Sequence, residues 1–451
     1  MTSKPDILQG TDGIRGRIST RQSLDNTHPL DFFLETGLLT PEFFECYTFA
    51  FATLLIDANL ARENENVVIG WDPRDRQGNF NRAAIAGIRK AGLNAIVAGT
   101  LPTPAMPLYM LSIDAAASVV LTASHNPADQ NGIKLFCGHT ALKLLPADDI
   151  TLTNRIHEQK SFDLSKLKET GGFELREQRV RDFFVTFCLD PRNSWIDTGD
   201  FKDSILVVDA SNGAVATVAE PVFSALPFQQ VEFTNMEGHI NERCGVADIE
   251  GMESISRDMV NSPDARFSGY QTLNRLFELA TKLKQGGSTG TSLIGLVFDG
   301  DGDRCYRLDY IPERDRFHVS SGDLLGIHQA RYLLNDDSAK GKLFVNTVES
   351  DLNTAITARD MGYEAVLTGV GDKWILSRAV LDQMQASLPE NQVHKESFQA
   401  FTEKENGLSA IDLSAWWQEV RKENVVPEKD QRKYAIGLEE SGHCITPGYF
   451  D

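Results

Sequence analysis

Short apolar runs recur along this chain, and most are followed by a polar loop and then by a segment with helical periodicity. These strand-like runs lie at 67–70, 95–97, 116–121, 205–209, 293–298, 343–347 and 364–368. Strands separated by helices form crossover units, which place neighbouring strands parallel in one sheet. We therefore expect an α/β fold, in which successive α/β domains carry mixed, largely parallel sheets flanked by helices. Ligands of such sheets bind outside the carboxyl ends of the strands, so the site should lie in a cleft between these domains.

Local signals support the expected helices and their limits. Thr40-Pro41-Glu42 combines an N-cap oxygen, a proline in the first turn and an acid near the positive end of the helix. Apolar residues then follow at positions 44, 47, 51 and 54, which places them on one helical face. A further helix is expected over 80–91, and others over 174–190, 214–226 and 352–361.

Composition shifts suggest three domains in the 451 residues. We predict domain limits of 1–160, 161–312 and 313–451, with the first boundary in the polar stretch that follows residue 155. The segments near 260–290 and 385–432 are expected to be insertions, and the second, being polar and charged, to lie on the surface.

The charge balance limits the partners. A formal net charge of −20 argues against nucleic acid or an anionic membrane, because both require a basic surface. An anionic substrate would instead need a local group of cations. The N-terminus lacks an apolar signal region, the stretch from 47 to 60 is broken by Asp57 and Asn59, and the six cysteines form no CxxC pair. We expect a soluble cytoplasmic protein and leave its oligomeric state open.

The first chemically suggestive loop is Thr122–Pro127, directly after a buried strand. Ser124 in this loop is a candidate nucleophile if a neighbour takes its proton and cations absorb phosphate charge. His125 and Lys134 are the nearby candidates for these roles. A polar turn containing Asn-Pro explains the same residues without any chemistry.

The second loop, Asp299–Arg304, places aspartates at positions 299, 301 and 303 with glycines between them. Alternate carboxylates converge on one hard cation when glycines let the backbone wrap closely. Few protein oxygens together with a bound phosphate suit Mg²⁺. An acidic surface turn is the alternative, but a buried strand leading into three spaced aspartates favours the metal site.

Two further loops are weaker signals when each is taken alone. Gly10–Gly16 surrounds Arg15 with glycines, which suits close approach to a phosphate and bidentate donation by the guanidinium. Glu439-Glu440-Ser441-Gly442-His443 follows a strand and offers a carboxylate and a hydroxyl to sugar hydroxyl groups.

Together and in this order, the four loops resemble those of the α-D-phosphohexomutase superfamily, which contains phosphoglucomutase, phosphomannomutase and phosphoglucosamine mutase. TASHNP at 122–127 is similar to the phosphoserine loop, DGDGDR at 299–304 to the metal loop, EESGH at 439–443 to the sugar loop and GTDGIRG at 10–16 to a phosphate-contact segment. Smaller matches at 102–105 and 368–373 extend the resemblance over nearly the whole chain.

The resemblance implies the following roles. Ser124 carries the phosphoryl group, and Mg²⁺ is bound by Asp299, Asp301, Asp303 and a phosphoserine oxygen. The phosphoryl group passes between the 1- and 6-positions of a hexose phosphate through a sugar 1,6-bisphosphate, which is also the activator. The residues implied to contact the reactive phosphate are Arg15, His125, Lys134 and Arg304. Those implied to bind the rest of the substrate are Thr11, Asp372, Lys373, Glu439, Ser441 and His443. Lys134 is also the candidate for proton transfer, with a pKa that neighbouring cations are expected to lower.

Three points qualify this expectation. The superfamily has a fourth, phosphate-gripping domain, whereas this chain ends at Asp451, so we expect weak turnover from the chain as given. The segment 241–245 slightly favours glucosamine phosphate over the phosphoglucomutase and phosphomannomutase alternatives. A catalytically impaired sugar-phosphate-binding fragment and a metal-dependent serine phosphatase remain as competing interpretations.

Overall fold

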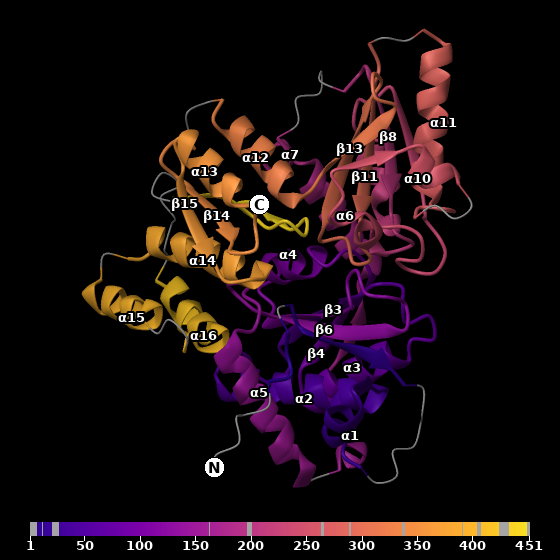
Figure 1. The fold of residues 1–451 in the computed structure, drawn as a ribbon. Helices are drawn as coiled ribbons and strands as arrows, with labels where there is room; N and C mark the ends of the chain where they lie inside the picture. The colour runs from indigo at the N-terminus through magenta and orange to yellow at the C-terminus, as the bar shows by residue number, and fades with distance from the viewer. Residues whose placement is uncertain are drawn as a thin grey trace.

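The structure is a computed structural model. It describes residues 7–10, 12–19, 27–161, 163–195, 201–262, 266–287, 290–335, 339–389, 391–403, 407–423 and 433–448. In this part of the chain, three mixed sheets are flanked by helices, as the sequence predicted (Figure 1). They span residues 14–175, 204–320 and 343–445. The predicted domain limits remain a prediction.

The first sheet has seven strands in the order β2-β1-β6-β5-β3-β4-β7. Its pairs are parallel except where β6 meets β1 and β5. The strands are β1 (Ile14–Ile18), β2 (Leu38–Leu39), β3 (Asn66–Trp71), β4 (Asn94–Thr100), β5 (Ala117–Leu121), β6 (Gln130–Cys137) and β7 (Phe173–Leu175). The helices around it are α1 (Pro29–Thr36), α2 (Pro41–Asp57), α3 (Asn79–Lys90), α4 (Ala105–Ser112), α5 (Pro146–Glu158), α6 (Glu177–Leu189) and α7 (Pro191–Ser194). Short 3₁₀ turns at Gln159–Ser161 and Leu164–Lys166 precede β7.

The expected helix start at Thr40 is confirmed, because its Oγ1 accepts a hydrogen bond from the N–H of Phe43 at 3.2 Å. Successive side chains of β3 enter two different apolar cores. Val67 and Ile69 pack with α2 and α3, whereas Val68 packs with α4 and α6. A strand buried on both faces reads as a continuous apolar run, which explains why β3 and β5 could be identified from the sequence.

The second sheet has six strands in the order β10-β13-β12-β11-β8-β9. They are β8 (Ser204–Asp209), β9 (Gln230–Thr234), β10 (Ser254–Ser256), β11 (Ser292–Phe298), β12 (Cys305–Ile311) and β13 (Arg316–Ser320). Its helices are α8 (Ala219–Phe223), α9 (Val246–Ile249), α10 (Asp258–Asn261) and α11 (Gln271–Gln285).

The helix expected over 214–226 was wrong in its extent, because this segment forms a 3₁₀ turn at Ala214–Thr217 and then the five-residue α8. β-branched residues and Pro221 both disfavour one continuous helix. Within 260–290, α11 packs Leu273, Leu276 and Phe277 into the core of the second sheet. This segment is therefore a structural layer.

The third sheet has four strands in the order β15-β14-β16-β17. They are β14 (Leu343–Thr347), β15 (Glu364–Thr368), β16 (Tyr434–Leu438) and β17 (Cys444–Ile445). The accompanying helices are α12 (Gly322–Leu333), α13 (Leu352–Asp360), α14 (Asp372–Ala386), α15 (Gln392–Thr402) and α16 (Ala410–Arg421).

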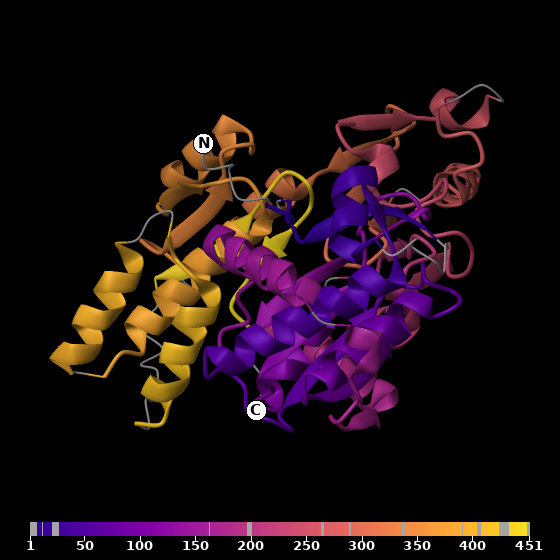
Figure 2. The same cartoon turned by 90° about the horizontal axis from the view of Figure 1, so that it is seen from below.

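The expectation that 385–432 lies on the surface was wrong for α16. Leu413 and Trp417 of this helix are buried in the same apolar core as the helices of the first sheet. Thr140 and Ser414 are also hydrogen-bonded through their hydroxyls at 2.6 Å. In Figure 2 the yellow C-terminal helices accordingly lie beside the indigo and purple N-terminal part of the molecule. The charged residues of α16 are exposed, and its apolar residues join the third sheet region to the first.

No helix among the described residues combines the length and apolar character needed to cross a membrane.

Candidate active site

Ser124 lies in the loop between β5 and β6, at the carboxyl end of β5. It is completely buried, and its backbone has a φ of +51°. Its Oγ donates a hydrogen bond to Oδ2 of Asp299 at 2.6 Å, although Asp299 follows β11 in a different sheet. The structure thus brings together the two loops that the sequence singled out.

Asp299, Asp301 and Asp303 offer carboxylate oxygens that lie within 4.8 Å of one another. Oδ1 of Asp301 is buried and has no hydrogen-bond partner among the described residues, whereas Oδ1 of Asp303 lies near the imidazole of His443. Burial, and then repulsion by the other two aspartates, raises the pKa of Asp299 to about 8. Free carboxylate oxygens in a buried, repulsive group fit a hard divalent cation, since the cation would supply both ligand bonds and opposite charge.

Lys134, on β6, lies in the centre of this acidic group. Its Nζ contacts Asp12 at 2.8 Å, Asp301 at 2.8 Å and Asp303 at 2.6 Å. Burial alone would lower the pKa of Lys134, but these three carboxylates raise it well above its ordinary value. The expectation of a lowered pKa was therefore wrong, because carboxylates and not cations surround the ammonium group.

The segment before β1 is joined to the start of α14 by buried charges. Asp12 accepts from Arg15 at 2.7 Å and also pairs with Lys143. Lys143 contacts Asp372 at 2.6 Å, and Lys373 donates to the carbonyl of Gly10 at 3.1 Å. The first and third sheet regions therefore meet at the site through residues 10–15 and 372–373. Thr11, an expected substrate contact, lies outside the described residues.

The sugar loop after β16 reaches the metal loop through His443. Nδ1 of His443 lies 2.6 Å from Oε1 of Glu439, and Nε2 lies 3.2 Å from Oδ1 of Asp303. Although burial lowers it, the carboxylates of Asp303 and Asp372 raise the pKa of His443 to about 10. Ser441 also donates to Glu439 at 2.5 Å. A charged imidazole between two carboxylates therefore connects Glu439 to the three-aspartate group.

His125 and Arg304 complete the predicted set. Burial, Arg304 and Arg15 lower the pKa of His125 to about 3, so at neutral pH it offers hydrogen bonds and no positive charge. Nδ1 of His125 is buried without a partner. Arg304 is buried, with its Nε 3.9 Å from Asp299. Arg304 supplies the fixed charge on this side of Ser124.

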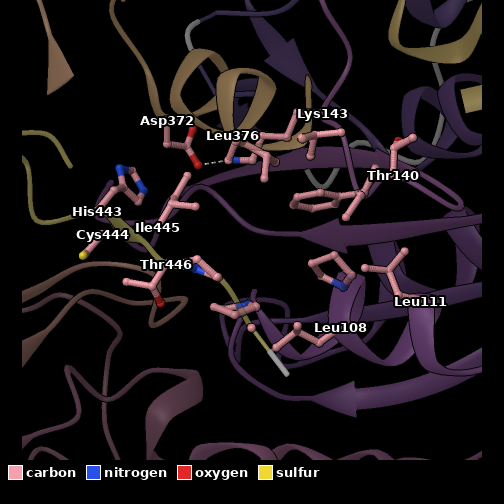
Figure 3. Close-up of a pocket in the computed structure, with 18 of the residues that line it drawn as sticks. Leu108, Leu111, Thr140, Lys143, Asp372, Leu376, His443, Cys444, Ile445 and Thr446 are labelled. Atoms are coloured by element: carbon pink, nitrogen blue, oxygen red, sulfur yellow. Dashed lines mark hydrogen bonds and ion pairs between the residues drawn. The ribbon is translucent and has the colours of Figure 1, made fainter. Parts of the chain in front are cut away.

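A cavity of about 450 Å³ adjoins the site (Figure 3). At one end, Asp372, Lys143 and His443 face one another, and the close-up shows the ion pair between the first two. The other end is apolar and includes Leu108 and Leu111 of α4. The charged end of the cavity is therefore continuous with the predicted site.

Several residues of the site were not identified from the sequence. Lys143 and Asp12 belong to the buried charge network, and Thr103 donates to Asp301 at 2.6 Å. Asp72 and Arg74 follow β3 and hold the Ser124 loop. For Asp72 and Arg74 the available signal was position, because charged residues directly after buried strands lie at the ligand-binding edge of a sheet.

Known proteins are similar to this chain in sequence and in fold. Residues 6–162 match the family model "Phosphoglucomutase/phosphomannomutase, alpha/beta/alpha domain I". A phosphoglucosamine mutase of Mannheimia succiniciproducens is 28% identical over 376 residues, covering 82% of this chain and 70% of that protein. Both matches agree with the resemblance to the α-D-phosphohexomutase superfamily. A phosphoglucosamine mutase of Pelotomaculum thermopropionicum is 30% identical over 325 residues, covering 70% of this chain and 63% of that protein.

Solved structures of the superfamily share the fold. A phosphoglucomutase/phosphomannomutase family protein of Burkholderia thailandensis aligns with a TM-score of 0.59 at 19% identity, covering 99% of this chain and 74% of that one. Parafusin, a phosphoglucomutase of Paramecium in an open form, aligns with a TM-score of 0.54 at 16% identity, covering 98% and 67%. At these identities the structures establish the α/β architecture of the superfamily and nothing finer.

Proposed function

We propose that this chain is a phosphohexomutase that uses Ser124 as phosphoryl carrier and glucosamine phosphate as its preferred substrate. The observation that carries the proposal is the 2.6 Å hydrogen bond from Oγ of Ser124 to Asp299, which joins a buried nucleophile to the three-aspartate group. The similarity to phosphohexomutases supports the reaction class.

The reaction consists of two phosphoryl transfers. In the first, the bond from Oγ of phosphorylated Ser124 to phosphorus breaks and a bond from a sugar hydroxyl oxygen to phosphorus forms, while the hydroxyl loses its proton and the freed Oγ takes one up. The resulting 1,6-bisphosphate turns over in the cleft. In the second, Oγ of Ser124 loses its proton and bonds to the other phosphoryl group, the bond from that phosphorus to the sugar oxygen breaks, and the released sugar oxygen takes up a proton. Little covalent chemistry falls to the protein, so positioning and charge stabilisation account for most of the rate.

Asp299, Asp301 and Asp303, with an oxygen of phosphorylated Ser124, would hold Mg²⁺. When bound, this ion neutralises the phosphate and carboxylate charges and acts as a Lewis acid on the transferring group. Three carboxylates and a phosphoserine, which carries nearly two negative charges, repel one another strongly without it.

The cations around Ser124 bind the reactive phosphate. Arg15 and Arg304 have fixed charges, and a guanidinium suits bidentate contact with phosphate oxygens. Lys134 is protonated at rest, so it serves first as a proton donor to Oγ of Ser124, the oxygen that leaves in the first transfer. This local positive group meets the requirement set by a net charge of −20, namely that an anionic substrate needs its own cationic site.

The burial of Ser124 favours a mutase over a phosphatase. Its exposed fraction is 0%, so a phosphoserine formed there is shielded from bulk water. A phosphatase needs a positioned water at this point, whereas a mutase must exclude water while the bisphosphate turns.

Glu439 and Ser441 would bind sugar hydroxyls, with His443 orienting Glu439. The preference for glucosamine phosphate rests on the relatives named phosphoglucosamine mutase and on the segment 241–245. Glucose and mannose phosphates are the alternatives.

The test is to incubate the purified chain with Mg²⁺, a trace of hexose 1,6-bisphosphate and, separately, the 6-phosphates of glucosamine, glucose and mannose. We expect the corresponding 1-phosphates, formed fastest from glucosamine 6-phosphate, without release of inorganic phosphate. Release of phosphate at the rate of sugar-phosphate loss would instead identify a phosphatase. Saturable sugar-phosphate binding without conversion or Ser124 phosphorylation would identify a binding protein.

A further inference from the structure

The backbone of Ser124 is held on both sides in an uncommon conformation. A φ of +51° lies in the left-handed region, which is unfavourable for a residue with a side chain. The carbonyl oxygen of Ser124 accepts hydrogen bonds from a guanidinium nitrogen of Arg74 at 2.8 Å and from Nδ2 of Asn241 at 2.7 Å. Its N–H donates to Oγ1 of Thr122 at 2.7 Å. Surrounding polar groups therefore maintain this conformation.

Arg74 contacts the loop at three carbonyl groups. Besides Ser124, its guanidinium donates to the carbonyls of Pro127 at 3.2 Å and Gln130 at 2.8 Å. The side chain of Arg74 is only 1% exposed. A planar group with five donors makes these contacts at once, whereas the single ammonium of lysine does not.

Asp72 fixes Arg74 in turn. Its two carboxylate oxygens accept from Nε of Arg74 at 2.9 and 2.8 Å. Oδ2 of Asp72 also accepts from the hydroxyl of Thr122 at 2.5 Å. The buried carboxylate of Asp72 therefore connects Thr122, which accepts from the Ser124 N–H, with Arg74, which donates to the Ser124 carbonyl.

Asn241 brings the second sheet region to the same point. It lies in the loop after β9, and its Nδ2 donates to the carbonyl of Asn126 at 3.0 Å as well as to that of Ser124. The second sheet region therefore contacts Ser124 twice. Asp299 accepts from its hydroxyl, and Asn241 donates to its carbonyl.

We infer that Arg74 and Asn241 are positioning residues for phosphoryl transfer at Ser124. They fix the Ser124 carbonyl, and the fixed backbone directs Oγ toward Asp299 and the transferring phosphoryl group. Neither side chain contacts Oγ, so both act through the Ser124 backbone. This role rests on the proposed function of Ser124.

The experiment compares Arg74→Lys, Asn241→Ala and Asn241→Asp with the unaltered chain. Asn241→Asp keeps the shape of the side chain but replaces the donor with an acceptor facing two carbonyls. Arg307→Lys is the matched control, since Nε of Arg307 contacts both oxygens of Asp309 at 3.0 Å, away from Ser124. The measurements are the rate of Ser124 phosphorylation by hexose 1,6-bisphosphate, kcat and KM for sugar phosphate, and Tm.

We expect all three site variants to phosphorylate Ser124 about 10²-fold more slowly, because a displacement of about 1 Å has an effect of that size. Their kcat should fall in parallel while KM stays within about twofold, since the substrate contacts remain. Arg307→Lys should change neither. Asn241→Asp should be as slow as Asn241→Ala, which a packing role would not produce.

Phosphorylation at the unaltered rate in Asn241→Ala and Asn241→Asp overturns the inference, even if Arg74→Lys fails to fold. A rise of KM of about 10²-fold in the site variants, with kcat unchanged, also overturns the inference, because that result assigns these residues to substrate binding. Failure of the unaltered chain to phosphorylate Ser124 would instead refute the proposed function.

Discussion

The backbone N–H of Ala410 donates a hydrogen bond to Oδ2 of Asp148 at 2.8 Å, although 262 residues separate the two in sequence. Asp148 also accepts from the N–H of Ile411 at 3.3 Å and from the hydroxyl of Ser409 at 2.6 Å. At the start of α5, the same carboxylate accepts a hydrogen bond from the N–H of Leu145 at 2.9 Å. One buried acid therefore caps the start of α5 and the start of α16.

Replacing Asp148 with alanine should loosen α16 from the first sheet region. The change leaves buried N–H donors of α16 without an acceptor, at a cost of about 1–3 kcal/mol. Hydrogen exchange should therefore become faster in residues 410–421. Asp149→Ala is the control, since Asp149 lies in the same helical turn but accepts from the N–H of Gln9. Equal protection of α16 in both variants would contradict the assigned role.

The same acid predicts a pH dependence of stability. Burial raises the pKa of Asp148 despite hydrogen bonds from Ser409 and backbone N–H groups. The folded state then binds this proton more readily than the unfolded state, so the ionised group lowers stability above its raised pKa. That loss is relieved as pH falls through the raised pKa toward the ordinary value. As pH falls over this interval, the free energy of unfolding in urea should rise for the unaltered chain relative to Asp148→Asn. A constant difference between the two would be evidence against the raised pKa.

Ser124→Ala should abolish phosphoryl transfer. Removal of a nucleophile lowers kcat by roughly six orders of magnitude in well-studied covalent enzymes. After incubation with hexose 1,6-bisphosphate, peptide mass spectrometry should locate one phosphate on Ser124 of the unaltered chain and none in the variant. Ser118→Ala is the control, since Ser118 is equally buried on β5 and its hydroxyl has no partner. A phosphate found on another residue would exclude the mechanism.

Asp301→Asn should weaken Mg²⁺ binding at least about tenfold, since even residues that only orient metal ligands have effects of this size. Titration calorimetry measures the affinity, and addition of EDTA to the unaltered chain should stop phosphoryl transfer until Mg²⁺ is restored. Asp309→Asn serves as the control, because its carboxylate pairs with Arg307 outside the three-aspartate group. Identical Mg²⁺ affinity in all three proteins would remove the basis for the metal site.

Lys134→Met should destabilise the fold as well as stop turnover. Removing one partner of a buried ion pair costs about 3–5 kcal/mol, and this change strands carboxylates of Asp12, Asp301 and Asp303 together. Lys422→Met is the comparison, since Lys422 forms an exposed pair with Glu419 and its loss should cost about 0–1 kcal/mol. Denaturant unfolding measures both. Equal losses in the two variants would show that Lys134 is not held as described.

Much of this architecture was accessible from periodicity alone. Strands buried on both faces, such as β3 and β5, produce uninterrupted apolar runs, and the Ser124 and Asp299 loops follow such strands directly. The fold class and the meeting of these loops could therefore be predicted. The pKa of Lys134 could not, because it depends on carboxylates contributed by distant segments of chain.

Arg74, Lys143 and α16 show what local sequence does not encode. The local sequence around Arg74 does not distinguish it from a surface arginine. Only its tertiary contacts with the Ser124 loop do so. The polar composition of 385–432 likewise concealed Leu413 and Trp417, since two apolar positions per turn suffice to dock a helix.

The attachment of α16 also restricts how the cleft opens. Lifting the third sheet region as a lid would break the contacts of Asp148 and Lys143 and expose Leu413 and Trp417 to water. Exposing one such large apolar side chain costs about 1.5–3 kcal/mol. Polar contacts and shared apolar burial therefore hold the third sheet region against the first.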